Sequence, residues 1–323
     1  MAKKEYLYSL DVIKGILILL VIIGHILQGS ANQNFARYLI YGFHMPLFIA
    51  VSGFLVNYER LRQIKAIELF KNYLYRVIIP WCLAVIGYYF IIHLKTGFHL
   101  KDLLYSFVSP FYHLWYIPAF LLYILITWLF SKIVHRFVFV LIFALLFSII
   151  GYVLFLDPQI IKNYHLAKLD TLFKIIKPQF YFFFCIGVSA KIYANILKWN
   201  KWGLFAILAI FTGIYISCFF QFNVLLSTIG FFVLNTALAI LILHIASNNK
   251  VRRVKILEWI GVNSLPVYLW HVVPLYILEQ TIYNTQKALF YIFSVLGVII
   301  VILIIKMLSK VNYINKYIFG SRS

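Results

Sequence analysis

The sequence has few charged residues and few cysteines, and common nucleotide-binding and zinc-binding motifs are absent. Charged residues make up 12% of the 323 positions, with 9 acidic residues in all, whereas hydrophobic residues make up 64%. This balance excludes a soluble globular protein. Cys82, Cys185 and Cys218 fall within or beside apolar stretches without zinc or CxxC spacing, so neither a disulfide framework nor a metal site is expected. The phosphate-binding patterns GxxxxGKS/T and GxGxxG are also lacking.

Apolar stretches long enough to cross a bilayer recur along the chain. A helix needs about 20 mostly apolar residues to cross the hydrocarbon core. We therefore predict an all-α polytopic membrane protein with about ten transmembrane helices. We expect residues 1–323 to form a single integral membrane domain without an additional soluble domain. The predicted spans cover residues 12–29, 36–56, 77–93, 114–131, 137–156, 178–193, 203–220, 224–246, 260–281 and 288–308.

The distribution of Lys and Arg predicts the topology, because cytoplasmic loops carry the excess of these residues. With the N-terminus inside, 20 of the 29 basic residues fall on the cytoplasmic side and 8 on the outer side, while Lys14 lies within the first span. We therefore expect both termini in the cytoplasm of a multi-pass protein in the plasma or inner membrane. The net charge of +20 then reflects topology and contact with anionic membrane lipid, so no nucleic acid partner is expected.

The first span has one polar face. Lys14 and His25 are eleven positions apart, which places them within roughly 20° on a helix and ~16 Å apart along its axis. Asp11 precedes Lys14 by about one turn on nearly the same face. Ionisable groups within the hydrocarbon are costly and usually mark a site, although Asp11 and Lys14 have the alternative of lying at the headgroup level. Because these charges interrupt the apolar run, we interpret it as a retained span and not a cleaved signal peptide.

The second span carries a histidine beside a proline. Its sequence includes Phe-His-Met-Pro-Leu-Phe at residues 43–48, followed by Ser52-Gly53-Phe54. A proline inside a helix removes one hydrogen bond, so Pro46 predicts a kink or break beside His44. The first span runs outward and the second returns, which places His25 ~6 Å and His44 ~12 Å below the outer ends of their helices. We expect the two imidazoles to meet in the outer half of the membrane.

The ninth span places Ser264, Tyr268 and His271 on one helix face. For His271, a structural hydrogen bond between packed helices is an equal alternative to a role in a site. His113 and Trp115 begin the fourth span at the outer interface, where amphipathic aromatic residues are expected in any membrane protein. The remaining histidines are assigned no role; they are His93, His99, His135, His165 and His244.

Taken together, these blocks resemble the acyltransferase 3 family of membrane acyltransferases. The shared pattern is a basic residue, ten intervening positions and a histidine, then Phe-His-Met-Pro-Leu-Phe with Ser-Gly-Phe. It continues with Tyr-Arg-Val-Ile-Ile-Pro at 75–80, His-Leu-Trp-Tyr-Ile-Pro at 113–118 and Asn-Ser-Leu-Pro-Val-Tyr-Leu-Trp-His at 263–271. The resemblance implies transfer of an acyl group, commonly acetyl, from cytoplasmic acyl-CoA to hydroxyls of surface polysaccharides, lipid-linked sugars or other exported acceptors.

The resemblance implies an O-acyltransferase that modifies saccharides by O-acetylation, with acetyl-CoA as donor substrate and no permanently bound cofactor or metal. His25 is the expected general base, with His44 as a second base, proton shuttle or oxyanion donor. We expect Lys14 and Arg76 to hold the CoA portion. The family most often has arginine where this chain has Lys14, which offers no bidentate fork. The remaining residues expected to bind substrate or acyl-CoA are Asp11, Ser52, Tyr268 and His271, and an acyl-serine at Ser52 is a less favoured route.

Two other functions are compatible with a polytopic membrane protein. A transporter or flippase of lipid-linked glycans would use broken helices at Pro46 and Pro266 as a binding site. The lack of recognisable paired repeats counts against this function. A non-catalytic subunit of a polysaccharide export complex would tolerate replacement of His25.

Overall fold

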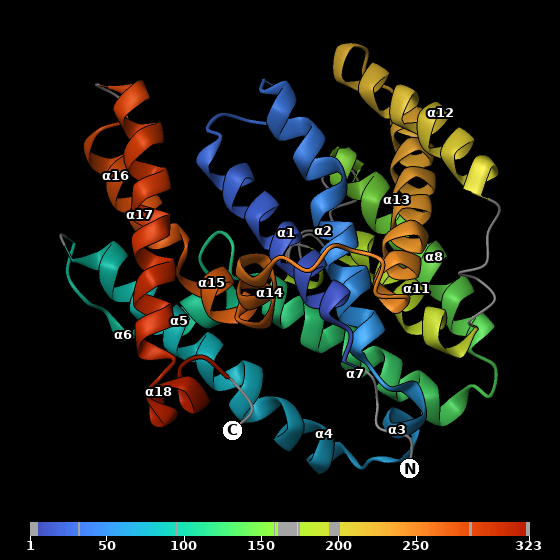
Figure 1. Ribbon diagram of the computed structural model, residues 1–323, viewed down its shortest axis with the longest axis horizontal. Helices are drawn as coiled ribbons and strands as arrows, with labels where there is room; N and C mark the ends of the chain where they lie inside the picture. The colour runs from blue at the N-terminus through green and yellow to red at the C-terminus, as the bar shows by residue number, and fades with distance from the viewer. Residues whose placement is uncertain are drawn as a thin grey trace. The chain divides into compact units, whose positions relative to one another are not determined.

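The computed structural model describes residues 6–31, 33–94, 96–157, 159–160, 173, 175–193, 201–283 and 286–320. All regular structure in these ranges is helical (Figure 1). Among the described residues, eight helices are long and apolar enough to cross a membrane, and one pair bent by 73° is a ninth candidate. The protein is therefore an all-α polytopic membrane protein, as predicted. Lys3, Lys4, His165 and most of residues 157–177 lie outside the described residues.

Each of the ten predicted spans overlaps helices of the structure, and nine of the ten are candidate membrane spans. The eight long candidates are α1 (Tyr8–Ile26), α2 (Phe35–Leu55), the continuous stretch Ala66–His93, α7 (Tyr116–Ile133), α8 (Phe137–Leu156), α12 (Lys201–Phe220), α13 (Val224–Ser247) and α17 (Lys287–Leu308). The bent candidate combines α14 (Lys255–Val262) with α15 (Ser264–Trp270) and α16 (Val272–Thr281). The expected sixth span is α11 (Tyr181–Ile192), whose 12 residues are too few to cross a bilayer alone.

Short helices connect or flank these spans. The stretch after α2 contains α3 (Tyr58–Gln63) and α4 (Ala66–Tyr73), and the π-helix η1 (Leu74–Ile78) joins α4 to α5 (Ile79–His93). The others are α6 (Leu100–Val108), the 3-10 helix η2 (Pro178–Phe180) and α18 (Asn312–Tyr317).

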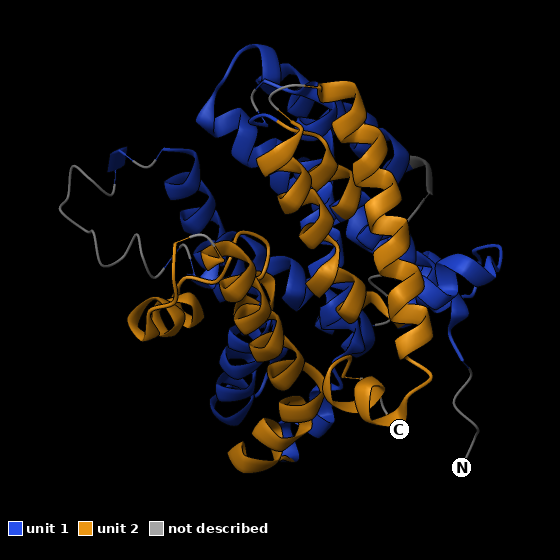
Figure 2. Cartoon of the chain, turned by 90° about the vertical axis from the view of Figure 1, so that its left-hand side faces the viewer, with its two compact units in different colours: residues 1–21, 29–63, 120–262 blue, residues 22–28, 64–119, 263–323 orange. Residues whose placement is uncertain are grey.

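The helices form two compact units, drawn in blue and orange in Figure 2. Unit 1 comprises residues 1–21, 29–63 and 120–262, and unit 2 comprises residues 22–28, 64–119 and 263–323. The helices α1 and α7 each contribute residues to both units.

In unit 1, α2 and α11 approach until their backbones touch. A Cβ atom on Gly187 would lie 1.9 Å from the carbonyl oxygen of Ala50, and one on Gly53 would lie 2.1 Å from that of Phe184. Glycine is required at both positions because any side chain would overlap the facing backbone. The helices α8 and α13 also pack against α11, so this short helix is buried along most of its length.

The structure shows no break at Pro46, because α2 continues as one α-helix from Phe35 to Leu55, and the other predicted outcome, a kink beside His44, stays a prediction. Proline lacks the N–H that would bond the carbonyl four residues earlier, which belongs to Gly42. The side-chain Nδ2 of Asn235 on α13 donates to this carbonyl at 2.8 Å. Asn235 is fully buried. A partner from a distant helix therefore replaces the lost hydrogen bond within the apolar interior. By contrast, Pro266 does follow a bend, the one between α14 and α15.

In unit 2, α15 packs against both α5 and α17, and α16 packs against α17. Gly87 on α5 makes room for the indole of Trp270, since a Cβ atom there would lie 2.9 Å from the ring. This close approach holds the end of α15 beside α5.

Candidate functional site

Three histidines of unit 2 gather at the end of α15. His25 lies in the last turn of α1, His113 in the loop between α6 and α7, and His271 directly after α15. The centroids of their rings are 5.3 Å apart for His25 and His271, 5.2 Å for His113 and His271, and 6.1 Å for His25 and His113. We call these three residues the histidine cluster.

The loop that carries His113 is fixed to α5 and α15. The hydroxyl of Tyr268 donates to the backbone carbonyl of His113, and Nε2 of His113 donates to the carbonyl of Leu269 at 3.2 Å. The indole Nε1 of Trp81 donates to the carbonyl of Leu114 at 3.1 Å. These bonds hold the imidazole of His113 inside unit 2, where it is 2% exposed.

The same loop places a tyrosine over His25. The backbone of Tyr112 has φ +23°, an uncommon value for a residue with a bulky side chain. Its hydroxyl lies 3.2 Å from Nδ1 of His25, and the two rings meet edge to face with centroids 5.0 Å apart. His25 is half-buried, whereas Tyr112 is 53% exposed. Solvent therefore reaches the histidine cluster from the side on which Tyr112 lies.

His271 is oriented by the helix that precedes it. Its Nδ1 lies 2.8 Å from the carbonyl oxygen of Tyr268 and 3.1 Å from that of Val267. Its backbone N–H also bonds the carbonyl of Val267. The side chain is fully buried.

Hydrogen-bonding partners define where the two buried imidazoles carry their protons. A carbonyl oxygen only accepts, so Nε2 of His113 and Nδ1 of His271 are the protonated nitrogens. In the neutral ring the opposite nitrogen carries a lone pair. That nitrogen is Nδ1 in His113 and Nε2 in His271, and both atoms are buried without a hydrogen-bond partner in the described residues. Burial, and secondarily the neighbouring His271, lowers the pKa of His113 well below its usual 6.5. His113 is therefore neutral near pH 7.

An aromatic wall closes the buried side of the histidine cluster. Tyr88 on α5 stacks on Phe111 at 4.9 Å and on Trp270 at 6.1 Å, and its ring meets that of His113 at 5.1 Å. The hydroxyl of Tyr88 is buried and, among the described residues, has no hydrogen-bond partner. The described residues contain no group of three or more His, Cys, Asp or Glu side chains that could hold a metal ion, and this includes the histidine cluster.

At the start of α1, Lys14 is paired with Asp11. Their side chains form an ion pair of 2.7 Å and are 16% and 13% exposed. The other carboxylate oxygen of Asp11 accepts a hydrogen bond from the hydroxyl of Tyr6 at 2.7 Å. This hydroxyl also lies 3.0 Å from the carboxylate of Glu258, which Arg253 binds through two nitrogens at 2.7 and 3.0 Å. The positive charge of Lys14 is thus compensated within unit 1.

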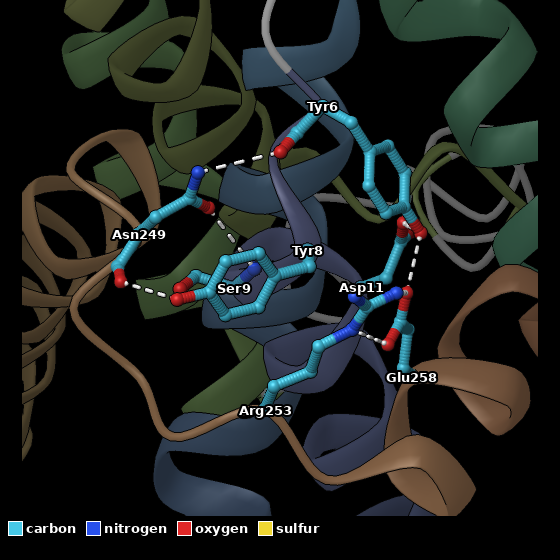
Figure 3. A network of polar contacts seen from close by, with 7 residues as sticks. All are labelled: Tyr6, Tyr8, Ser9, Asp11, Asn249, Arg253 and Glu258. Carbon is cyan, nitrogen blue, oxygen red and sulfur yellow. Dashed lines mark hydrogen bonds and ion pairs between the residues drawn. The ribbon is translucent and has the colours of Figure 1, made fainter.

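Asn249 ties the first turn of α1, and Tyr6 ahead of it, into the same network, which Figure 3 shows. Its backbone carbonyl accepts from the hydroxyl of Tyr8 at 2.9 Å, its Oδ1 accepts from the N–H of Ser9 at 3.3 Å, and its Nδ2 donates to the carbonyl of Tyr6 at 3.3 Å. We call the residues drawn in Figure 3 the N-terminal network; they are Tyr6, Tyr8, Ser9, Asp11, Asn249, Arg253 and Glu258.

Two glycines allow this network to form by bringing α1 and α14 into backbone contact. A Cβ atom on Gly261 would lie 1.7 Å from the carbonyl oxygen of Asp11, and one on Gly15 would lie 2.1 Å from that of Leu257. The contact places Glu258, one residue beyond Leu257, beside the start of α1.

The structure therefore groups only some of the residues predicted from the sequence. His25, Tyr268 and His271 lie together, and Asp11 is paired with Lys14. His44 belongs to unit 1, where it is 2% exposed and its Nδ1 lies 2.6 Å from the carbonyl of Ile40. Its expected meeting with His25 in unit 2 stays a prediction.

Ser52 and Arg76 are two further residues that the sequence predicted to bind substrate, and they lie on α2 and η1. The hydroxyl of Ser52 on α2 donates to the carbonyl of Phe48 at 2.8 Å. Arg76 is exposed in η1, where its carbonyl would lie 2.1 Å from a Cβ atom on Gly320. Neither placement assigns these residues a chemical role.

Sequence reasoning missed His113 and Tyr112. The block His-Leu-Trp-Tyr-Ile-Pro at 113–118 contained a signal, but a histidine ahead of a span needs no special explanation. Its closeness to His271 depends on contacts between residues more than 150 positions apart.

A family model described as "Acyltransferase domain" matches residues 7–307. Two proteins named "Nodulation protein NolL" match a short stretch: one from Sinorhizobium fredii (strain NBRC 101917 / NGR234) is 44% identical over 61 residues. The other, from Mesorhizobium japonicum (strain LMG 29417 / CECT 9101 / MAFF 303099), is 48% identical over 62 residues. Each match covers 17% of this chain and 17% of the relative. No solved structure matches the chain.

Proposed function

Because the chain belongs to the acyltransferase family that matches residues 7–307, we propose that it transfers an acyl group to a saccharide hydroxyl. The proposed donor is a cytoplasmic acyl-CoA, and the proposed acyl group is acetyl. The proposed acceptor is a surface polysaccharide or a lipid-linked sugar. In this proposal the protein lies in the plasma or inner membrane with both termini in the cytoplasm.

The observation that carries the proposal is the histidine cluster. His25 combines partial exposure with two buried imidazoles beside it, those of His113 and His271. A sugar hydroxyl is a poor nucleophile at neutral pH, so its attack on a thioester needs a base within hydrogen-bond reach, an effect worth ~10²- to 10⁴-fold. An imidazole is suited to this task because its ordinary pKa lies near physiological pH.

The proposed reaction is direct transfer with His25 as general base. The acceptor hydroxyl gives its proton to His25 while its oxygen forms a bond to the thioester carbonyl carbon. The carbon–sulfur bond then breaks, and the leaving thiolate of CoA takes the proton from His25. His25 is thereby returned to its neutral form, and no metal or covalent enzyme intermediate takes part in this route.

The donor is proposed to be held by basic residues near the cytoplasmic ends of the helices. Lys14 and Arg76 are the proposed contacts of the CoA phosphates, and Asp11 modulates the charge of Lys14 through the ion pair of 2.7 Å. His44, Ser52 and Tyr268 stay in the proposed set, His44 as a second base, proton shuttle or oxyanion donor and the other two as substrate-binding groups.

The course of α2 counts against the flippase alternative. It depended on broken helices at Pro46 and Pro266, and α2 is continuous through Pro46. Only the bend between α14 and α15 survives from that expectation.

The decisive experiment measures transfer of labelled acetyl from acetyl-CoA into cell-envelope glycans by membranes that contain the protein. The wild type is compared at equal expression with His25→Ala and with His93→Asn, a substitution of a histidine on α5 outside the histidine cluster. We expect label with the wild type and His93→Asn but not with His25→Ala. Label from His25→Ala at the wild-type level would remove His25 from catalysis, and movement of unmodified glycan without label would favour the flippase.

A further inference from the structure

Unit 1 contains an apolar pocket between four of its helices. The pocket has a volume of about 570 Å³ and is lined by residues within 13–20 on α1, 39–47 on α2, 208–216 on α12 and 234–245 on α13, together with Val251. All of these residues belong to unit 1, and no member of the histidine cluster lines the pocket. A volume of this size is in the range of pockets that hold small organic molecules.

The lining of the pocket favours an apolar occupant. None of the described residues that line it is charged, and Thr212 and Tyr215 are the two among them with a polar side-chain atom. Burial of a polar group without a hydrogen bond is costly, so a sugar or a charged group does not fit this lining. Tyr215 is also held in place, because its ring stacks on that of Tyr38 with centroids 4.6 Å apart. The body of the pocket therefore suits a hydrocarbon chain.

The extent of the pocket matches one leaflet of a bilayer. On α13 the lining runs from Leu234 to Ile245, which is about 16 Å along the helix axis. The hydrocarbon core of a bilayer is about 30 Å thick, so one leaflet contributes about 15 Å. All four helices of the wall are long and apolar enough to cross a membrane. The pocket thus has the length of a phospholipid acyl chain, whereas the longer polyprenyl chain of a lipid-linked sugar exceeds it.

Basic residues flank the pocket at Val251. Lys250 and Arg252 are its neighbours in the chain, so their Cα atoms lie about 3.8 Å from that of Val251. Both residues are exposed, and neither forms an ion pair with a carboxylate in the part of the chain that the structure describes. By contrast, the next residue, Arg253, is bound to Glu258. Two positive charges without a compensating carboxylate therefore stand at the rim of the pocket.

Hydrogen bonds hold the backbone of this rim in place. The N–H of Lys250 donates to the carbonyl of Ile245 at 3.2 Å, and the N–H of Val251 donates to Oγ of the fully buried Ser9 at 3.1 Å. The ammonium Nζ of Lys250 lies 3.4 Å from Nε2 of His244. A ring nitrogen that accepts this hydrogen bond has no negative charge, so Lys250 keeps its positive charge for a ligand.

We propose that this pocket binds an anionic phospholipid, with one acyl chain between α1, α2, α12 and α13 and the phosphate against Lys250 and Arg252. The chain gains little by leaving the bilayer, since lipid tails are as apolar as the lining. Selectivity comes from the headgroup, because each basic residue near a membrane surface strengthens the binding of anionic lipid about fivefold. In the proposed topology this end of the pocket faces the cytoplasm, whose leaflet carries anionic lipid. Lipid binding here is independent of acyl transfer.

Two pairs of variants separate this site from general contact with lipid. Leu238→Trp places a larger side chain among the lining residues. Leu225→Trp makes the same exchange on α13 at a residue that is 67% exposed and does not line the pocket. Arg252→Gln or Lys250→Gln removes a cation from the rim, whereas Arg60→Gln removes an exposed cation on α3.

The experiment is native mass spectrometry of the purified, delipidated protein titrated with dioleoyl phosphatidylglycerol, which is anionic, or dioleoyl phosphatidylcholine, which is zwitterionic. We expect the wild type to bind one phosphatidylglycerol about tenfold or more tightly than phosphatidylcholine. Arg252→Gln and Lys250→Gln should each weaken binding of phosphatidylglycerol about fivefold and leave that of phosphatidylcholine unchanged. Leu238→Trp should weaken binding of both lipids about tenfold, because its side chain fills the pocket. Leu225→Trp and Arg60→Gln should match the wild type.

Three results would overturn the proposal. Equal affinity of the wild type for the two lipids, or equal losses in Leu238→Trp and Leu225→Trp, would mean that lipid only surrounds the protein. Tighter binding of undecaprenyl phosphate than of phosphatidylglycerol, with its loss in Leu238→Trp, would assign the pocket to the chain of a lipid-linked acceptor. Because Arg252 is exposed, Arg252→Gln keeps the fold and decides the role of the rim charge independently of the stability of Leu238→Trp.

Discussion

Lys14 and Asp11, one turn apart on α1, form an ion pair of 2.7 Å while both side chains are largely buried. Asp11 therefore limits the positive charge that Lys14 can offer to an anionic ligand. An ion pair near a surface is worth about 1 kcal/mol or less, which corresponds to roughly fivefold in binding.

From this pairing we predict that Asp11→Asn tightens binding of acyl-CoA by up to about fivefold. Lys14→Arg should retain activity, and Lys14→Met should raise KM for the donor. The measurement is KM for acetyl-CoA in membranes at equal expression. Weaker donor binding in Asp11→Asn, or unchanged KM in Lys14→Met, would show that Lys14 does not bind the donor.

The Asn235 side chain should stabilise α2 only because residue 46 is proline. We predict that Asn235→Ala leaves the Gly42 carbonyl unsatisfied and lowers the free energy of unfolding by about 1–3 kcal/mol. In a Pro46→Ala background the helix supplies its own N–H, so the same substitution should cost less. Unfolding of the four variants in detergent gives the coupling between the two sites. Identical costs in both backgrounds would contradict this account of how the proline is accommodated.

The backbone contact between α1 and α14 should tolerate no added methyl group. We predict that Gly261→Ala lowers the free energy of unfolding by about 1–3 kcal/mol, because its Cβ would lie 1.7 Å from the carbonyl of Asp11. Gly213→Ala on α12 is the matched control, since its Cβ meets nothing within 4 Å. That substitution should be neutral or stabilising by up to about 1 kcal/mol. Thermal unfolding in detergent compares the two, and similar midpoints would show that the contact can relax.

His113 should make the folded protein sensitive to acid. Burial keeps its pKa well below 6.5 in the folded state, whereas the unfolded chain takes up a proton near 6.5. This contribution to stability is thus fully present above pH 6.5 and declines as the pH falls toward the folded pKa, by at most about 1.4 kcal/mol per pH unit. We predict that His113→Gln, which keeps a donor for the carbonyl of Leu269, loses less stability than the wild type on acidification.

Midpoints of thermal unfolding for the wild type and His113→Gln, taken between about pH 7.5 and about pH 4.5, measure this difference. The difference between the two curves isolates His113 from the other buried histidines. Parallel curves would mean that His113 is not held neutral by burial.

The sequence predicted the spans and singled out two of the three histidines that the structure brings together, because both inferences depend on local properties. Apolar length is readable from the chain, and a histidine inside an apolar run is costly wherever the helix lies, which singled out His25 and His271. His113 was missed because it precedes its span, where an imidazole has water available. Its role as a neighbour of His271 arises from bonds to Leu269 and Tyr268, which sequence spacing does not encode.

The errors have the same origin. Proline in a helix predicts a break when only the helix is considered, but the Gly42 carbonyl finds Asn235 193 positions away. The pairing of Lys14 with Asp11 was foreseeable from their spacing, whereas the link from Asp11 through Tyr6 to Glu258 was not, because it depends on the glycine contact between α1 and α14.

The shortness of α11 has a consequence for how the chain enters the membrane. A helix of 12 residues is about 18 Å long and leaves its ends within the hydrocarbon if it is inserted alone. Its backbone must therefore be received by helices already in place, and the contacts at Gly53 and Gly187 show that α2 is one of them. Since α2 and α8 precede α11 in the chain, two of the three helices that pack against α11 are already synthesised when α11 leaves the translocon.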